Sequence, residues 1–252
     1  MKIHILTIFP ELFECVEKEG IIKIANERRL LDLYLHNLRD YTKDKHRTTD
    51  DTPYGGGAGM VMLATPVIKG IVDIEKKSGP SYKVILTPQG ERFTQKTANF
   101  LKDKESLLFI PAHYEGIDER VIELADMELS TGDYVVSGGE LPTMLVVDAV
   151  VRLIPGVLGN MSSLSEESFE KNLLEYPQYS RPREISGKGV PDVLISGHHE
   201  NIKKWRLKQS LKRTLIKRPD LIFKKRFTKE EKEFLKEIKD ELEEVLKEIL
   251  NR

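Results

Sequence analysis

The chain has 252 residues, 39% of them hydrophobic and 32% charged, and its 40 basic and 41 acidic side chains leave a net charge of −1. This composition indicates a globular protein of one large or two moderate domains. No apolar run reaches the roughly 18 residues of a membrane-spanning helix, and no signal-peptide pattern opens the chain, so we expect a cytoplasmic protein. The single cysteine, Cys15, excludes an intramolecular disulfide, and we expect it to pack within an amphipathic helix.

Strand and helix patterns alternate along the first 159 residues. Alternating apolar positions over 2–9 predict a first strand, and the amphipathic stretch 11–20 predicts the helix that follows it. The later elements expected from the same patterns are strands at 31–38, 83–87, 107–111 and 134–136 and helices at 94–102 and 142–153. Strands that alternate with helices predict an α/β fold with a mostly parallel sheet.

Serine and acidic residues concentrate in 160–170, directly after Gly156 and Gly159. This composition is typical of a flexible linker, so we predict a boundary there between domains 1–159 and 171–252. Near the end of the second domain, apolar residues recur on one helical face, which predicts a surface helix packed along that face. The residues of this stripe are Phe234, Leu235, Ile238, Leu242, Val245, Leu246 and Ile249.

Charge is distributed unevenly along the chain. Residues 203–226 hold eleven lysines and arginines against one acid, Asp220, which is a net charge of +10 in 24 residues. Clustered cations displace the counterions of a polyanion, so this segment predicts a nucleic-acid partner. A solvated basic helix is the alternative, although such helices usually interleave acids at i,i+4 spacing.

Glycine turns follow three of the predicted strands. They occupy 88–90, 113–120 and 132–142, and in an open α/β sheet such loops meet at the carboxyl ends of the strands, where ligands bind. Gly138 and Gly139 would let the backbone approach a ligand closely, although an ordinary turn between strand and helix is the alternative. The glycine-rich loop 50–60 lacks the Lys-Ser or Lys-Thr of a phosphate-binding loop, and no dinucleotide fingerprint follows the first strand.

Six motifs stand in a fixed order along the chain. They are Tyr54-Gly-Gly-Gly-Ala-Gly-Met60, Pro88-Gln-Gly90, Tyr114-Glu-Gly-Ile-Asp-Glu-Arg120, Gly132-Asp-Tyr-Val-Val-Ser-Gly-Gly-Glu-Leu-Pro142, Ile154-Pro-Gly-Val-Leu-Gly159 and Trp205-Arg-Leu-Lys-Gln-Ser210. Together they resemble the bacterial tRNA (guanine-N1)-methyltransferases, the TrmD family, over residues 1 to about 221.

The resemblance implies a specific reaction and architecture. Members transfer a methyl group from S-adenosyl-L-methionine to N1 of the guanosine at position 37 of tRNA, immediately 3′ of the anticodon. The implied fold is a mostly parallel α/β sheet with a deep C-terminal trefoil knot, as in SPOUT methyltransferases, plus a small helical C-terminal domain that binds tRNA. A homodimer with active sites at the subunit interface is implied, with no membrane contact. Magnesium dependence stays open, and no residue is assigned to a metal.

The same resemblance assigns residues to roles. Glu167 would be the general base and Arg152 the catalytic arginine. The cofactor would lie against Pro88, Gly90, Tyr114, Glu115, Gly116, Ser130, Gly132, Tyr134, Val135, Val136, Gly138, Gly139 and Pro142. The tRNA would contact His46, Arg47 and Asp50 together with Lys203, Lys204, Arg206, Lys208, Lys212 and Arg213 of the basic segment.

Guanine chemistry explains the two catalytic assignments. N1 of neutral guanine carries a proton, so a carboxylate must remove it while a fixed cation stabilises the charge that develops on O6. Without the resemblance, the sequence favours a helix C-terminal arginine and a catalytic arginine equally for Arg152, and it favours a solvated linker acid for Glu167. The chain departs from the usual family pattern at Ala112-His113, where Gly-Arg is common, and at Glu167, where an aspartate is common.

The resemblance leaves two alternatives open. One is an RNA-binding regulatory protein that keeps the knotted fold without catalysis, and the other is a related methyltransferase that acts on rRNA.

Overall fold

The computed structural model describes residues 1–159 and 167–250. The chain divides into two compact units, Met1–Met161 (unit 1) and Ser162–Arg252 (unit 2). Residues 160–166 of the predicted linker lie outside the described residues, and 167–170 form a bend and a turn.

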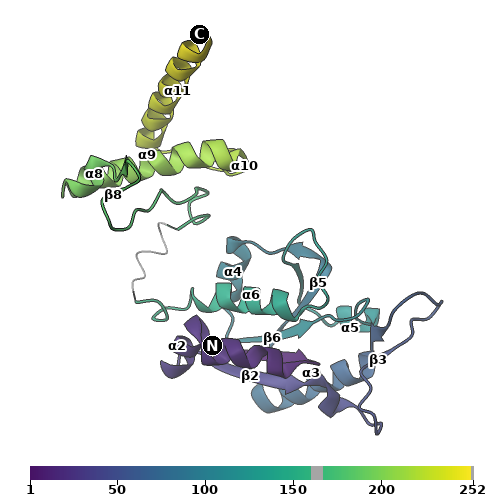
Figure 1. The fold of residues 1–252 in the computed structure, drawn as a ribbon. Helices are drawn as coiled ribbons and strands as arrows, with labels where there is room; N and C mark the ends of the chain where they lie inside the picture. Colours follow the sequence, from purple (N-terminus) through teal and green to yellow (C-terminus); the bar gives the residue numbers. More distant parts are fainter. Residues whose placement is uncertain (160–166, 251–252) are drawn as a thin grey trace. The chain divides into compact units, whose positions relative to one another are not determined.

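A five-stranded parallel sheet lies at the centre of unit 1 (Figure 1). The strands run in the order β2-β1-β6-β5-β7, and every neighbouring pair is parallel, as the alternation of strands and helices predicts. The strands are β1 (Lys2–Thr7), β2 (Asp32–Asn37), β5 (Tyr82–Arg92), β6 (Ser106–Pro111) and β7 (Met127–Ser130). A separate short hairpin pairs β3 (Asp50–Asp51) with β4 (Val61–Met62).

Helices cover both faces of the sheet, because each parallel crossover must bury an apolar helix face. On one face, Val67, Ile71 and Ile74 of α3 pack on strand residues of the core, with α5 beside α3. On the other face, α6 packs against β6, α2 and α4 (Figure 1). The helices of unit 1 are η1 (Pro10–Phe13), α1 (Glu14–Lys18), α2 (Gly20–Glu27), η2 (Leu38–Tyr41), α3 (Ala64–Ser78), α4 (Gln95–Leu101), α5 (Glu119–Ile122) and α6 (Glu140–Val151).

Two of the elements predicted from the sequence are wrong. The strand expected at 134–136 is part of a loop, and the last strand of the sheet is β7, which ends at Ser130. The helix expected at 11–20 is broken into η1, α1 and α2, with extended backbone at Glu19. Cys15 is exposed rather than packed. The helix α3 was not predicted at all.

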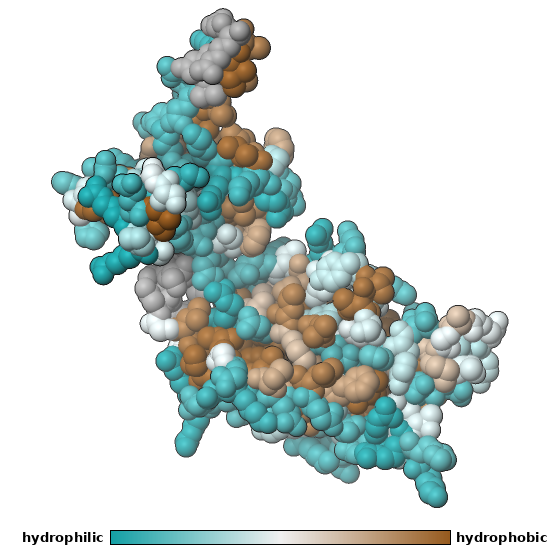
Figure 2. Space-filling model, in the orientation of Figure 1, coloured by the Kyte–Doolittle hydropathy of each residue, from teal (hydrophilic) through white to brown (hydrophobic). Residues whose placement is uncertain are grey.

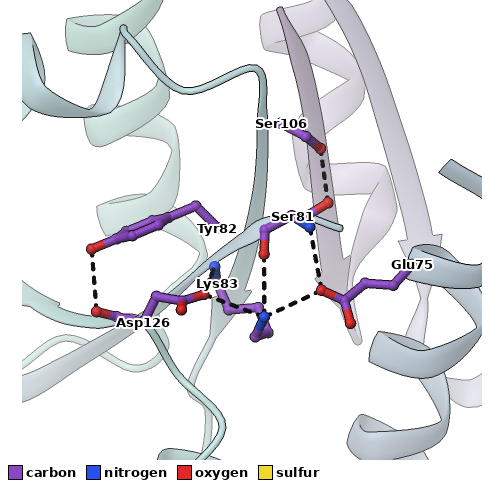
Figure 3. A network of polar contacts seen from close by, with 6 residues as sticks. All are labelled: Glu75, Ser81, Tyr82, Lys83, Ser106 and Asp126. Atoms are coloured by element: carbon purple, nitrogen blue, oxygen red, sulfur yellow. Dashed lines mark hydrogen bonds and ion pairs between the residues drawn. The ribbon is translucent and has the colours of Figure 1, made fainter. Parts of the chain in front are cut away.

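A polar network closes the amino-terminal edge of the sheet (Figure 3). The ammonium of Lys83 lies 3.2 Å from Glu75 Oε1 and 3.3 Å from Asp126 Oδ2. The hydroxyl of Ser81 lies 2.8 Å from that of Ser106. Burial opposes the charge of Lys83, but its two carboxylate partners raise its pKa above the ordinary value. The network therefore joins α3, β5, β6 and the entry to β7 at the edge opposite the carboxyl ends of the strands.

Two histidines stack side by side on β1 and β2. His4 is 1% exposed, and its Nδ1 lies 3.0 Å from Nε2 of His36, with the ring of Tyr34 stacked on it at 4.8 Å. Burial, the neighbouring His36 and the charge of Lys2 lower the pKa of His4 to about 4. His4 is therefore a neutral core residue at physiological pH.

Unit 2 is mainly helical. Leu211 of α9 and Ile238 of α11 form the centre of its small core, but only the first half of α11 packs there. Leu242, Leu246 and Ile249 are 37%, 55% and 62% exposed, so the prediction of a helix packed along its full stripe is wrong. Within the described residues, no helix has the length and apolar character needed to cross a membrane. The elements are β8 (Glu184–Ile185), β9 (Lys188–Gly189), α8 (Asp192–Ile195), α9 (His199–Lys217), α10 (Pro219–Ile222) and α11 (Lys229–Leu250).

The buried His4 makes the stability of unit 1 depend on pH. Its pKa of about 4 in the folded state lies below 6.5 in the unfolded chain, so the unfolded chain binds more protons between these values. The contribution of neutral His4 to the free energy of unfolding is fully present above pH 6.5. It is lost as pH falls toward 4, by up to about 3 kcal/mol. Denaturant melts at pH 7 and pH 4.5 should therefore show a smaller acid loss for His4→Phe than for wild type. His46→Phe, in an exposed loop, should behave as wild type, and an unchanged acid loss in His4→Phe would contradict the assignment.

Candidate active site

Three segments on β5, β6 and β7 surround a cavity of about 300 Å³. They are residues 87–91, the irregular part of β5, and the loops 112–118 and 131–139 that follow β6 and β7. This is the edge of a parallel sheet at which α/β proteins bind ligands, and the volume is at the lower end of the about 300–1,000 Å³ of small-molecule sites.

Backbone hydrogen bonds fix the three loops to one another. The N–H of Ala112 donates to Leu86 O at 3.2 Å, and the carbonyl of Ala112 accepts from the N–H of Gly139 at 2.6 Å. Tyr114 in turn forms a bridge to Val61 of the β3–β4 hairpin. The backbone thus holds the segments that carry the cavity lining in place.

Gly139 packs so tightly that it excludes a side chain. A Cβ atom at this position would lie 2.8 Å from Ala112 N and 2.9 Å from Pro111 Cα, both backbone atoms that cannot turn aside. The N–H of Gly139 lies at the start of α6, so the contact also sets where that helix begins.

Gly90 is the one residue of the predicted cofactor set that does not line this cavity. A Cβ atom there would lie 2.4 Å from Leu129 N. Leu129 pairs with both Leu86 and Glu91 in the ladder, so residues 87–90 bulge out of the pairing between β5 and β7. Gly90 therefore packs against the backbone of β7 beside the cavity.

The cavity lining combines exposed apolar side chains with carboxylates. Tyr134 and Val135 are 55% and 86% exposed although they face the cavity. Glu115 and Glu119 supply negative charge. At its rim, hydrogen bonds from Arg120 lower the pKa of Asp118 below the ordinary value. Such a lining suits a ligand with one flat apolar part and one cationic or hydroxyl-bearing part.

A buried carboxylate lies beneath the loops. Glu140, 3% exposed, accepts from the Thr7 hydroxyl at 3.1 Å and lies 3.1 Å from Nδ1 of His113. The ring of Phe9 packs edge-on against His113 at 5.2 Å. These contacts tie the end of β1, the start of α6 and loop 112–118 together, so His113 has a structural partner at the site.

Twelve of the thirteen residues predicted to contact the cofactor line this one cavity, and Gly90 is the exception. The lining residues outside the predicted turns are chiefly strand ends and their neighbours. They include Leu86, Thr87, Ala112, Leu129 and Thr131. The position of the first three at the end of a predicted strand was the available signal, whereas the strand that ends at Ser130 was not predicted.

The two predicted catalytic residues belong to different units. Arg152 caps the C-terminus of α6 in unit 1, and its N–H donates to Asp148 O at 3.2 Å. Glu167 lies in unit 2, where it lines a second cavity with Lys203 and Arg206. Their joint action on one substrate stays a prediction.

The predicted RNA-binding residues of unit 1 lie on and beside an exposed loop. Arg47 pairs with Asp40, and its Nε donates to Arg39 O at 3.3 Å. His46 is exposed, and Asp50 pairs with Met62 in the hairpin.

The basic segment of unit 2 is partly neutralised by α11. Lys208 lies 2.6 Å from Glu237 and 2.9 Å from Glu241, and Lys212 lies 2.7 Å from Glu241. The pairing raises the pKa of Lys208 above its ordinary value. Glu237 and Glu241 of α11, about thirty residues further along the chain, thus offset part of the positive charge of residues 203–226.

The other predicted cations of α9 differ in their surroundings. Lys203, Lys204 and Arg213 are exposed, and Arg206 lies over the ring of Tyr176 at 4.6 Å. Among the described residues, no cluster of three or more His, Cys, Asp or Glu side chains is placed to hold a metal ion.

Comparison with known proteins identifies the family. The family model described as tRNA (Guanine-1)-methyltransferase TrmD matches residues 1–224. The chain belongs to this family. Relatives of the TrmD family named tRNA (guanine-N(1)-)-methyltransferase from Dictyoglomus turgidum and Bacillus cereus strain AH820 are each 51% identical, over 93% of this chain and 95% and 97% of their own. The crystal structure of tRNA (m1G37) methyltransferase from Aquifex aeolicus matches with a TM-score of 0.73 at 39% identity, covering 89% of this chain and 95% of that one.

The packing at Gly139 gives a direct test of the cavity. Gly139→Ala would push loop 131–139 away from the end of β6, so binding of S-adenosylmethionine, the predicted cofactor, should weaken by about tenfold or more in calorimetry. Gly159→Ala is the matched control, since a Cβ atom there meets nothing within 4 Å. Circular dichroism melts should confirm that both variants are folded. Equal affinity in the two variants would remove this loop from the site.

Proposed function

We propose that this chain is an S-adenosylmethionine-dependent tRNA methyltransferase that methylates N1 of guanosine 37. The observation that carries the proposal is the cavity at the carboxyl ends of β5, β6 and β7, in a chain that belongs to the TrmD family. The names of the relatives and of the structural neighbour describe the same reaction.

The cavity suits the cofactor in three respects. The exposed rings and branched side chains of Tyr134, Val135 and Val136 offer a surface for an adenine ring. Glu115 and Glu119 can accept hydrogen bonds from ribose hydroxyls and an ammonium group. The glycine-lined backbone leaves room for close approach. When bound, S-adenosylmethionine would supply the electrophilic methyl group and would leave as S-adenosylhomocysteine, because the bond between its sulfur and that carbon breaks as the bond to N1 forms.

The residues of the chain handle the proton and the charge. Glu167 accepts the proton from N1 of the guanine, which leaves an electron pair on N1 for attack on the methyl carbon. The guanidinium of Arg152 stabilises the negative charge that develops on O6. Glu140 and His113 are positioning residues: their contact holds the start of α6 and loop 112–118 in place.

We propose that unit 1 contains the deep trefoil knot implied by the family. The supporting observation is that residues 87–90 bulge out of the pairing between β5 and β7 opposite Leu129, after which the chain crosses to Gly139 beneath Ala112. A chain that passes through a loop in this way is rare in proteins.

We further propose a homodimer with active sites at the subunit interface. Figure 2 shows apolar side chains gathered on the face of unit 1 over α6 and the helices near the N-terminus. Leu12, Leu141 and Leu145 on these elements are 47%, 61% and 48% exposed. A contiguous apolar face of this kind marks an interaction surface.

Unit 2 is proposed to bind the tRNA through the exposed cations of α9. Because the substrate is tRNA, we place the enzyme in the cytoplasm. Magnesium is not assigned a role.

Replacing the proposed base tests the reaction. Glu167→Gln keeps the size of the side chain but not its basicity, so single-turnover methyl transfer from labelled S-adenosylmethionine should fall by roughly 10²-fold while both ligands still bind. Glu166→Gln controls for a one-residue error in the assignment. Full activity in Glu167→Gln would show that this carboxylate is not the base. A transcript with adenosine in place of guanosine 37 should accept no methyl group, and methylation of that transcript would contradict the proposed target.

The apolar face of α6 predicts the oligomeric state. Leu145→Glu places a charge on this face, so sedimentation velocity should show monomers where the wild type shows dimers, and methyl transfer should be lost with the dimer. Val72→Glu, on α3, changes an exposed apolar residue on the other face of the sheet and should leave the dimer intact. Dimeric Leu145→Glu would place the interface elsewhere.

A further inference from the structure

The cavity of unit 1 has one basic side chain in its wall. Of the described residues that line it, only His113 can carry a positive charge, whereas Glu115 and Glu119 supply negative charge. These two carboxylates suit the hydroxyl and ammonium groups of S-adenosylmethionine, but they cannot bind its α-carboxylate, because carboxylates only accept hydrogen bonds when ionised. The imidazole of His113 is the side chain that could donate to that group.

Contacts beneath the cavity hold the ring of His113 and leave one of its nitrogens for a ligand. Nδ1 lies 3.1 Å from Oε2 of Glu140, which is 3% exposed and also accepts from the Thr7 hydroxyl. The rings of Phe9 and Tyr114 pack edge-on against the imidazole at 5.2 and 4.9 Å. Within the described residues Nε2 has no hydrogen-bond partner, and 18% of the side chain is exposed.

Gly138 shows how closely the chain is built around this pair. His113 and Gly138 form an antiparallel bridge, so loop 131–139 crosses directly beside the imidazole. A Cβ atom at Gly138 would overlap both Nδ1 of His113 and Oε2 of Glu140. The ring is therefore fixed in position before any ligand enters, and binding would not require it to be ordered.

The charges around the ring determine which protons it carries. Glu140 lies in the first turn of α6, where the helix dipole favours its negative charge, so Nδ1 is the donor in their contact. A second carboxylate at Nε2 would need a donor there too, and the ring would then be an imidazolium between two carboxylates. Tyr114 is the other titratable group in contact with the ring, while Thr7 and Phe9 at the end of β1 are uncharged.

We propose that His113 binds the α-carboxylate of S-adenosylmethionine through Nε2, with Glu140 as the positioning residue that holds the ring and balances its charge. The inference rests on the proposed function, because it takes S-adenosylmethionine as the ligand of this cavity. Glu115 and Glu119 attract the ammonium group and His113 attracts the carboxylate, so opposite charges orient the amino-acid end of the cofactor. A nucleoside without a carboxylate lacks this contact and binds more weakly.

Three ligands that differ by one charged group test the contact in calorimetry. S-adenosylhomocysteine has the complete amino-acid end, and its decarboxylated and deaminated analogues each lack one group. The wild type should bind the decarboxylated analogue at least about tenfold more weakly than S-adenosylhomocysteine. His113→Asn keeps a donor in the place of Nδ1 but removes Nε2. It should raise the Kd of S-adenosylhomocysteine and of the deaminated analogue about tenfold, and that of the decarboxylated analogue less than about twofold.

His198→Asn is the matched control, because His198 is an exposed histidine of unit 2 outside this cavity, and it should bind all three ligands as the wild type does. Thermal melts should confirm that both variants are folded. Equal losses for all three ligands in His113→Asn would show that His113 only holds the loop. A loss that spares the deaminated analogue would make Nε2 an acceptor for the ammonium group. Either result would overturn the proposal.

Nitrogen NMR of protein labelled at histidine reads the protons of the ring directly. In the complex with S-adenosylhomocysteine at about pH 7, both nitrogens of His113 should have the shifts of a protonated imidazole. His113→Asn identifies the signal by its disappearance. An unprotonated Nε2 in that complex is incompatible with the proposed contact.

These readouts separate the inference from the proposed function. Affinities and nitrogen shifts are measured whether or not methyl transfer occurs. Methylation of guanosine 37 by the wild type together with equal losses for all three ligands in His113→Asn would overturn the role of His113 alone. A wild type that binds neither S-adenosylmethionine nor S-adenosylhomocysteine would overturn the proposed function and this inference with it.

Discussion

The candidate site depends on one contact between backbone atoms, where loop 131–139 crosses the end of β6. The 2.6 Å hydrogen bond from Gly139 N to Ala112 O has no space for a side chain beside it. This contact brings the loop after β7 over the loop after β6 and starts α6 at the same point. Because this bond joins main-chain groups, the sheet sets the position of the loop, and side-chain rotamers affect only the lining that the loop carries.

Much of unit 1 could be predicted from the sequence because its signals are local. Apolar alternation located β1, β2 and β6, and glycines after predicted strands located the loops of the cavity. The strand predicted at 134–136 is wrong because β-branched residues such as Val135 and Val136 favour strands, yet here they line an open cavity. The role of Glu140 could not be predicted, because its partner Thr7 is 133 residues away.

In unit 2, the net charge counted along residues 203–226 overstates the positive charge that the folded chain presents. The reason is that Glu237 and Glu241 of α11 lie outside the segment and pair with two of its lysines. The cations that remain exposed or line a cavity are therefore the informative ones, and a count along the chain cannot distinguish them. Likewise the apolar stripe of α11 is continuous in sequence, while its core contacts end near Ile238.

The register shift between β5 and β7 also limits how the chain can vary in length. Leu129 lies opposite both Leu86 and Glu91, so residues 87–90 must leave the ladder and return to it at the same partner. One residue more or fewer would turn Arg92 to the other face of the sheet and move Gly90 off the peptide it touches. By contrast, Gly55 and Gly56 have open space around them. A change in the length of residues 87–90 would therefore disturb both the β5–β7 pairing and the close packing of Gly90, whereas no such packing surrounds Gly55 and Gly56.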